Sequence, residues 1–287
     1  MKNKKDLTII SCSRRTDIPA FYYSWLQECL KRKFVLVQNP YTNQSMQVDL
    51  SPDKVHSIVL WSKNFGNVIN DPQYLENYCL YFQFTITGYS NRLEQNVIDS
   101  KCAVKQMEML ANRYSPECIN WRFDPIMLGI EIEKEPTPDK VGKARLKMFE
   151  SLCRDISSFG VKRCTISFVT LYKAVENRLK RFNIHYLNLS EDLQKQFAAH
   201  LVEIADKYGV TIYSCANPII ESVPRIKKGH CIDGALLEKL FGKPVTHAKD
   251  TGQREACGCT KSVDIASYNQ VCKHSCLYCY SHSSQWV

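Results

Sequence analysis

The feature that most constrains the fold is an alternation of short apolar runs with longer helical patterns. The runs are rich in Val, Ile, Thr and aromatic residues, which is typical of β-strands, and they cover residues 7–11, 34–38, 57–62, 80–87, 118–123, 164–170, 210–215 and 262–267. Helical patterns lie between them, at residues 20–30, 138–158 and 190–208. About eight strands with interleaved helices predict an α/β fold, a full or partial TIM-like (β/α) barrel.

Neither a long linker nor a low-complexity segment interrupts this alternation, so we expect a single barrel domain over residues 1–287. The second run is the weakest barrel strand, because the sequence that follows it reads as the return strand of a hairpin. Residues 216–260 carry several Pro and Gly residues and four of the clustered cysteines flank or interrupt them. We expect this segment to be an irregular insertion organised by a second metal site.

Composition excludes several classes of protein. The hydrophobic fraction is 44%, the charged fraction 23% and the formal net charge +9, which excludes a disordered or fibrous chain. No stretch approaches the ~20 apolar residues of a membrane-spanning helix, so we expect no membrane partner. The apolar run near the N-terminus is shorter than a secretory signal requires. We therefore expect a cytoplasmic protein.

The fourteen cysteines are the unusual part of the composition. Seven are spread through the first 164 residues, mostly in apolar or helical contexts, and are expected to be small buried hydrophobic residues. The other seven lie between residues 215 and 279. Because the cytosol keeps thiols reduced, this clustering indicates metal binding rather than disulfides.

Three of these cysteines, Cys272, Cys276 and Cys279, form a C-x3-C-x2-C motif just after the last predicted strand. Three thiolates can hold three irons of a [4Fe–4S] cluster and leave the fourth iron open. The amine and carboxylate of a ligand can then chelate that iron. The alternative is a zinc site completed by His274 or His282.

This motif resembles that of the radical S-adenosylmethionine (SAM) superfamily, in which the loop after the first barrel strand carries the three cysteines. The resemblance implies an enzyme that cleaves SAM and generates a 5′-deoxyadenosyl radical, with Tyr278 along the adenine through its ring or backbone. Such an enzyme needs an electron donor such as flavodoxin or ferredoxin.

In ordinary members of the superfamily the motif lies near the N-terminus, whereas here it lies near the end of the sequence. A circular permutation reconciles the two arrangements. Residues 262–267 then form the first barrel strand, and residues 7–11 form the next one around. We therefore expect these two strands to be parallel neighbours.

The whole chain also resembles an uncharacterised bacterial family, classed as a domain of unknown function, whose C-terminal cysteines look radical-SAM-like. The resemblance spans nearly all of residues 7–282 and rests on SCSRRTDIPAFY, LWSKN, YFQFTITGY, WRFDPI, SFV and DIASYNQVCKHSCLYCY. It implies an architecture and a cofactor, but no reaction. The Gly-Gly-Glu motif that usually binds the SAM amino group is absent, and its permuted equivalent is Ser13 to Asp17.

Polar residues follow several predicted strands. In a parallel barrel these ends share one face, where active sites are built. The predicted contacts of SAM and substrate are Arg14, Arg15, Asp17, Lys63, Asn64, Gln83, Arg122, Asp124 and Tyr278. The four cations among them predict a basic mouth suited to an anionic ligand. Asp17 is expected to be either a helix cap or a partner of the SAM amine.

The four remaining clustered cysteines are Cys215, Cys231, Cys257 and Cys259. Four thiolates can ligate an auxiliary [4Fe–4S] cluster completely. Zinc accepts the same ligands, and the absence of any metal is the third possibility, since Cys215 and Cys231 could be buried and inert.

The leading hypothesis is thus a radical SAM enzyme whose substrate, small or macromolecular, the sequence does not identify. One alternative is a two-cluster electron-transfer protein, but such a carrier gains nothing from an open iron. The other is a nucleic-acid-binding or repair module with a structural metal, which the net charge permits.

Overall fold

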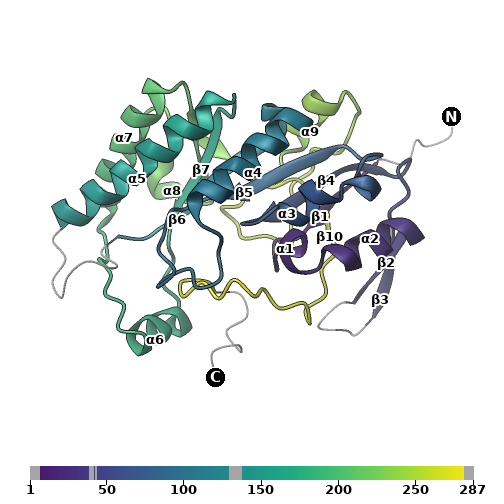
Figure 1. Cartoon of the computed structure of the whole chain (residues 1–287), viewed down its shortest axis with the longest axis horizontal. Helices are drawn as coiled ribbons and strands as arrows, with labels where there is room; N and C mark the ends of the chain where they lie inside the picture. The colour runs from purple at the N-terminus through teal and green to yellow at the C-terminus, as the bar shows by residue number, and fades with distance from the viewer. Residues whose placement is uncertain (1–6, 39–41, 43, 129–137, 281–287) are drawn as a thin grey trace.

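The centre of the protein is an open sheet of eight parallel strands (Figure 1). The computed structural model describes residues 7–38, 42, 44–128 and 138–280. The strand order is β10-β1-β4-β5-β6-β7-β8-β9, and each of the seven neighbouring pairs is parallel. The strands are β1 (Thr8–Cys12), β4 (Val55–Ser62), β5 (Leu80–Thr85), β6 (Ile119–Ile126), β7 (Arg163–Phe168), β8 (Thr211–Cys215), β9 (Lys227–Gly229) and β10 (Val263–Asp264).

The α/β class predicted from the alternation is confirmed. β9 and β10 form the two edges of the sheet, and no ladder within the described ranges joins them. A closed barrel is therefore not seen in this part of the chain, and the partial barrel stays a prediction.

The two ends of the sequence meet in the sheet. β1 pairs with β10 in parallel, with Ile10 opposite Val263 and Ser11 opposite Asp264. The predicted neighbourhood of these strands is confirmed. The cysteine motif therefore follows an edge strand that pairs with β1. The circular permutation itself stays a prediction.

The second predicted strand lies outside this sheet. β2 (Phe34–Gln38) pairs in antiparallel fashion with β3 (Ser45–Asp49) as a separate two-stranded sheet, which confirms the hairpin. The eighth place in the main sheet is taken by β9, which no sequence pattern predicted. β9 is a three-residue Lys-Lys-Gly strand within residues 216–260, and it has none of the β-branched or aromatic residues that mark a strand.

Helices cover one face of the sheet, as the group of α3, α4, α5 and α7 in front of the strands in Figure 1 shows. Trp121, Phe82 and Phe149 are fully buried in the core between them. The helices are α1 (Ile18–Phe21), α2 (Tyr23–Arg32), α3 (Gly66–Asn70), α4 (Ser100–Arg113), α5 (Pro138–Ser158), α6 (Lys173–Arg181), α7 (Glu191–Lys207), α8 (Pro218–Glu221) and α9 (Gly234–Phe241), with single 3-10 turns at Gln73–Leu75 and Pro116–Cys118.

The other face of the sheet packs against the segment that was expected to be irregular. Ile9, Val59 and Tyr81 come from β1, β4 and β5, and they share a buried apolar cluster with Leu237 of α9 and Val245. The residues next to these three in each strand point to the opposite face of the sheet, which the helices cover, because successive strand residues point to opposite faces. The segment 216–260 thus contains α8, β9 and α9 and packs against the sheet. The single-domain prediction itself stays a prediction.

None of the helices in the described ranges combines the length and the apolar character that crossing a bilayer demands.

Candidate cofactor and metal sites

Residues 271–279, here named the cysteine loop, contain the C-x3-C-x2-C motif and run along the carboxyl ends of the strands. Figure 1 shows this segment in yellow, running from β10 past the ends of the strands toward α6. At its start, Tyr22 donates its hydroxyl proton to the carbonyl oxygen of Val271 at 2.7 Å. At its end, Arg178 of α6 donates to the carbonyl oxygens of Leu277, at 3.1 Å, and Cys279, at 2.6 Å. The loop is therefore held at both ends.

The middle of the cysteine loop pairs with the loop after β5. Glu94 and Cys276 form an isolated antiparallel bridge, and the Leu277 amide donates to the Leu93 carbonyl oxygen at 2.9 Å. Cys276 is buried, and burial raises the pKa of its thiol well above the usual value. Burial, with the nearby Asp17 carboxylate, raises the pKa of Cys272 to about 11. The thiols of Cys272, Cys276 and Cys279 interact electrostatically with one another.

A buried ion pair lies against the cysteine loop. Lys63 Nζ and Glu94 Oε1 are 2.8 Å apart, with side chains 12% and 4% exposed. The same oxygen accepts hydrogen bonds from the hydroxyl of Thr87, at 2.7 Å, and from the hydroxyl of Tyr278. Tyr278 thus turns its hydroxyl into this cluster, and its adenine contact through the ring or the backbone stays a prediction.

The ion pair keeps both charges despite burial. Burial by itself would raise the pKa of Glu94, but the Lys63 ammonium and the three hydrogen bonds hold it below its usual value. Burial would likewise lower the pKa of Lys63, but Glu94 and the nearby Cys276 thiol raise it. A cation therefore lies beside the thiol at the centre of the motif, where it offsets part of the effect of burial on the pKa of Cys276.

Asp17 connects the cysteine loop to two strand ends. Its Oδ1 accepts from the Ala20 amide at 2.9 Å, which confirms the helix-cap prediction. Oδ1 also accepts from the Ser62 hydroxyl, at 2.7 Å, and Oδ2 accepts from the Lys63 amide, at 2.8 Å. Its Oδ2 lies 2.7 Å from Nε2 of the buried His274, in the middle of the motif. With these partners the Asp17 carboxylate links α1, the end of β4 and the cysteine loop. Its contact with a SAM amine stays a prediction.

The other four clustered cysteines come together in a second place, here named the four-thiol group. The Sγ atoms of Cys215 and Cys231 are 3.0 Å apart. Cys259 shares a hydrogen bond with Cys231 and another with Cys257. The hydrogen bond with Cys231 and burial raise the pKa of Cys215 well above its usual value. The hydrogen bond from Cys259 outweighs burial at Cys257 and lowers its pKa to about 7.

Glycine at position 258 allows the tight turn between Cys257 and Cys259. A Cβ atom there would lie 2.5 Å from Nε2 of His230, the residue before Cys231. Only glycine lets the turn approach this ring without displacing it.

Three of the predicted SAM and substrate contacts lie at the four-thiol group. Arg122 Nη1 is 3.0 Å from the Cys231 Sγ, and its Nη2 pairs with Asp124. Gln83 Nε2 donates to the Cys231 carbonyl oxygen at 2.6 Å. Desolvation opposes the charge on Arg122, but the Cys231 thiol and Asp124 raise the pKa of the guanidinium. Gln83, Arg122 and Asp124 thus lie at the four-thiol group. Asp17, Lys63 and Tyr278 instead lie at the cysteine loop.

Three of the four cations that were expected to form one basic mouth lie beside carboxylates. Lys63 pairs with Glu94, Arg122 pairs with Asp124, and Arg14 lies 3.8 Å from Asp250. Such cations are largely removed from water, and a buried charge needs an opposite charge beside it. Carboxylates therefore balance these three cations, and Arg15 instead contacts a carbonyl oxygen and an aromatic ring.

The predicted residues Arg14, Arg15 and Asn64 have different surroundings. Arg15 Nη1 donates to the Ala266 carbonyl oxygen at 2.8 Å, and its guanidinium lies over the Tyr268 ring at 4.2 Å, between β10 and the cysteine loop. Arg14 lies over the Trp61 ring, at 5.9 Å. Asn64 Oδ1 accepts from the Gly66 amide, at 3.0 Å, and from Gln106, at 2.9 Å. This is a local role at the start of α3.

Two carboxylates of the site were missed by the sequence reasoning. Glu94 lies in a loop without a recognisable pattern. Asp264 lies inside a predicted strand, and it accepts from the hydroxyls of Ser11, at 3.0 Å, and Ser13, at 2.6 Å, and from the Arg14 amide, at 2.9 Å. A charged residue within an apolar strand was the one available signal for Asp264.

Among the described residues, no three or more His, Cys, Asp or Glu side chains have the arrangement of a metal-ion site. The zinc alternative for the cysteine loop needs His274 or His282 as its fourth ligand. Both ring nitrogens of His274 have other partners, namely Asp17 and the Asn96 carbonyl oxygen, the latter at 3.1 Å. His282 lies outside the described residues. Ligands of a [4Fe–4S] cluster bind different irons, so they need not converge on one point.

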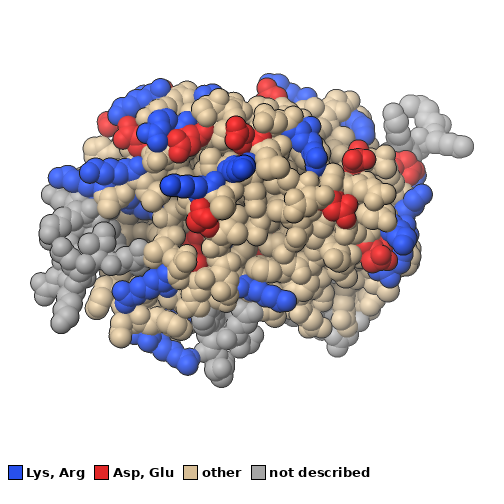
Figure 2. Space-filling model, viewed as in Figure 1, with Lys and Arg blue, Asp and Glu red and all other residues tan. Residues whose placement is uncertain are grey.

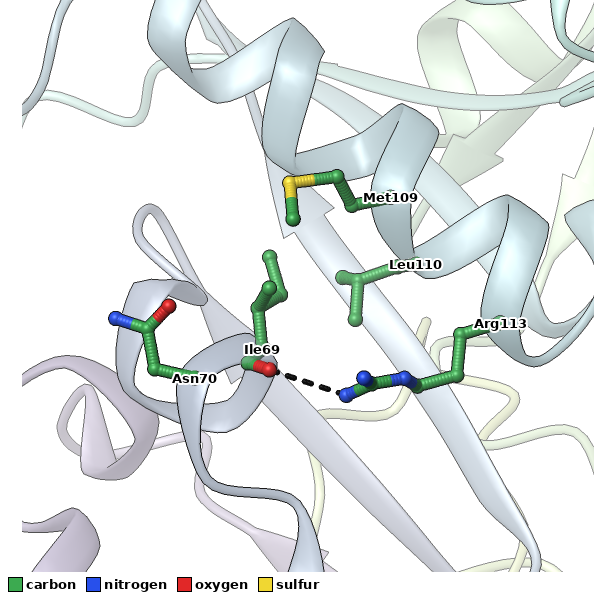
Figure 3. Close-up of a pocket in the computed structure, with 5 residues that line it drawn as sticks. All are labelled: Ile69, Asn70, Met109, Leu110 and Arg113. Carbon is green, nitrogen blue, oxygen red and sulfur yellow. Dashed lines mark hydrogen bonds between the residues drawn. The ribbon is translucent and has the colours of Figure 1, made fainter.

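A surface pocket lies away from both sites, between α3 and α4. Figure 3 shows its lining, with Arg113 donating to the Ile69 carbonyl oxygen at 3.0 Å. Its volume is about 310 Å³. Asn70, Met109 and Leu110 complete the lining, which contains no pair of groups suited to acid–base or metal chemistry.

Figure 2 bears on the nucleic-acid alternative. On the face shown, Lys and Arg side chains are dispersed and interleaved with Asp and Glu over the helices. Nucleic-acid-binding surfaces gather cations into a patch or stripe, and the described residues on this face do not.

Comparison with known proteins identifies the family. The family model described as "Domain of unknown function (DUF1848)" matches residues 9–281. The chain belongs to the DUF1848 family. This match covers both cysteine groups and every strand of the main sheet except the first residue of β1.

Other comparisons add no function to the DUF1848 assignment. No curated protein matches the chain. A solved structure of Rhizobium etli pyruvate carboxylase, crystallized without acetyl coenzyme-A, is 12% identical, with a TM-score of 0.25. The match covers 83% of this chain and 26% of the pyruvate carboxylase chain, so this chain spans about a quarter of the length of the carboxylase. Likeness at this level supports no conclusion.

Proposed function

We propose that this DUF1848 protein is a radical SAM enzyme built on a circularly permuted partial barrel. The observation that carries the proposal is the position of the cysteine loop. It follows β10, which pairs in parallel with β1, and it continues along the carboxyl ends of the strands to α6. The C-x3-C-x2-C motif alone would suit other iron–sulfur proteins, but this placement puts it where a parallel α/β fold builds its active site.

The surroundings of the loop fit an iron–sulfur cluster with an open iron. Cys272, Cys276 and Cys279 would be its ligands, and the Lys63 ammonium beside Cys276 would offset part of the negative charge of the thiolates. When bound and reduced, such a cluster supplies the electron that cleaves SAM into methionine and a 5′-deoxyadenosyl radical.

The protein's own residues would hold the loop and exclude water. Asp17 and His274 fix the middle of the loop, and Arg178 fixes its end. Lys63, Glu94 and Tyr278 form a buried wall behind Cys276. The organic chemistry belongs to the cofactor, and the chain contributes binding, orientation and electrostatics.

Arg15 is a better candidate than Arg14 for holding the SAM carboxylate. Its guanidinium contacts Ala266 and Tyr268, between β10 and the cysteine loop, whereas Arg14 faces Asp250 and Trp61. A charge-assisted hydrogen bond contributes about 1.5–3 kcal/mol. We expect Arg15→Ala to weaken SAM binding by roughly 10- to 150-fold with iron content unchanged. Arg14→Ala is the matched control and should bind SAM like the parent.

Binding can be measured from the change that SAM causes in the electron paramagnetic resonance spectrum of the reduced cluster. A spectrum that does not respond to SAM would contradict the proposed function. Equal SAM affinity of Arg15→Ala and the parent would instead remove Arg15 from the site and leave the proposed function standing.

A further inference from the structure

We propose that Cys215, Cys231, Cys257 and Cys259 ligate a second [4Fe–4S] cluster. This proposal does not depend on SAM chemistry, because it concerns a different set of thiols. Its ligands come from the end of β8, from the residue that lies two positions after β9, and from the loop before β10. Three distant segments of the chain thus bring their thiols into one contiguous group.

The contact between the thiols is that of free cysteines. The 3.0 Å between Cys215 Sγ and Cys231 Sγ exceeds the ~2.05 Å of a disulfide bond, and all four cysteines are free. Four free cysteines in one group are the number that ligates a [4Fe–4S] cluster completely.

Two buried hydrogen-bond donors without partners lie around the four-thiol group and favour an iron–sulfur cluster over zinc. Trp61, whose ring packs in the same apolar cluster as Cys231 and Cys259, has a buried Nε1 atom without a hydrogen-bond partner. Nη2 of Arg14, whose guanidinium lies over the Trp61 ring, is also buried without a partner. The sulfides of an iron–sulfur cluster accept such hydrogen bonds, whereas a zinc ion with four thiolates brings no further acceptor.

Two further observations agree with this assignment. Arg122 donates to Cys231 Sγ at 3.0 Å, and the Ile232 amide donates to Cys259 Sγ at 3.5 Å. Hydrogen bonds to ligand sulfur are a means by which proteins set the potential of a cluster. In addition, Cys257 and Cys259 are separated by one residue, whereas paired zinc ligands are typically separated by two to four.

The second cluster would lie at the same end of the sheet as the cysteine loop. Tyr280, directly after Cys279, interacts electrostatically with both Cys279 and Asp124. Asp124 in turn pairs with the Arg122 that contacts Cys231. The four-thiol group thus lies near the end of the cysteine loop.

The test counts metal and sulfide in the full chain after anaerobic reconstitution. The parent should contain about eight irons and eight acid-labile sulfides. The variant Cys257→Ser/Cys259→Ser should contain about four of each, as should Cys215→Ser/Cys231→Ser, which covers the case in which one pair variant does not fold. Cys102→Ser, at an exposed position on α4, is the control and should match the parent.

The variant Cys272→Ala/Cys276→Ala/Cys279→Ala isolates the second site and should retain about four irons and four sulfides. Stoichiometric zinc in place of this iron, a disulfide between Cys215 and Cys231 in mass spectra, or undiminished iron in both pair variants would overturn the proposal. Failure of the proposed function looks different, because the parent would then leave SAM intact while each pair variant still lost about four irons.

Discussion

Cys276→Ala is expected to remove one cluster, about four irons per chain, and to reduce SAM cleavage to the background rate. Cys276 is the buried central cysteine of the motif, and its backbone pairs with Glu94. Alanine keeps that backbone pairing and removes only the thiol. With two thiolates left, the cluster would lose the third ligand that holds it, and no electron could reach SAM.

Iron analysis and product chromatography on the same anaerobic preparations measure both effects. Cys153→Ala is the matched control, since it removes an equally buried thiol from the helical side of the core. It should retain its iron and its activity. If Cys276→Ala keeps all its iron, Cys276 is not a ligand.

The second large effect is expected from Glu94→Gln, which leaves the Lys63 charge buried without its counter-ion. Breaking a buried pair by removing one partner typically costs about 3–5 kcal/mol. We therefore expect the free energy of unfolding to fall by about this amount in urea titrations of the reconstituted protein. Lys63→Met/Glu94→Leu, which removes both charges, should recover a large part of the loss.

Arg154→Gln provides the comparison, because it breaks an ion pair with Asp155 whose side chains are 61% and 45% exposed. That change should stay within about 0.5 kcal/mol. The pH dependence gives a second check. Since the folded-state pKa of Glu94 is lowered, its stabilising contribution is present above its unfolded pKa of about 4.3 and is lost as the pH falls through the folded value. If Glu94→Gln unfolded like the parent at neutral pH, the buried pair would not stabilise the fold.

The parts of the fold that follow from local patterns were predictable from the sequence. The apolar runs at residues 57–62, 80–87 and 164–170 correspond to β4, β5 and β7, because strands buried on both faces are apolar throughout. β9 was not predictable, since Lys227 and Lys228 are exposed and the strand depends on its pairing with β8. The packing of α9 against Ile9 and Val59 is likewise a long-range contact that no local pattern specifies.

The candidate site was predictable from the sequence only where its residues lie close together along the chain. The cysteines of the C-x3-C-x2-C and C-x-C motifs are close in sequence, so their grouping could be read directly. The partners of these cysteines come from elsewhere in the chain: Glu94 reaches Cys276 from the loop after β5, and Arg122 reaches Cys231 from β6. The polar residues at strand ends indicated polar sites. They could not show that Lys63 lies at the cysteine loop and Arg122 at the four-thiol group, each paired with a carboxylate.

The central claim is tested most directly by the formation of 5′-deoxyadenosine. The anaerobically reconstituted chain would be incubated with SAM and dithionite, and the products would be separated by chromatography. The account predicts 5′-deoxyadenosine and methionine in equal amounts, with neither formed when dithionite or Cys276 is absent. A reduced protein with full iron content that leaves SAM intact would contradict it.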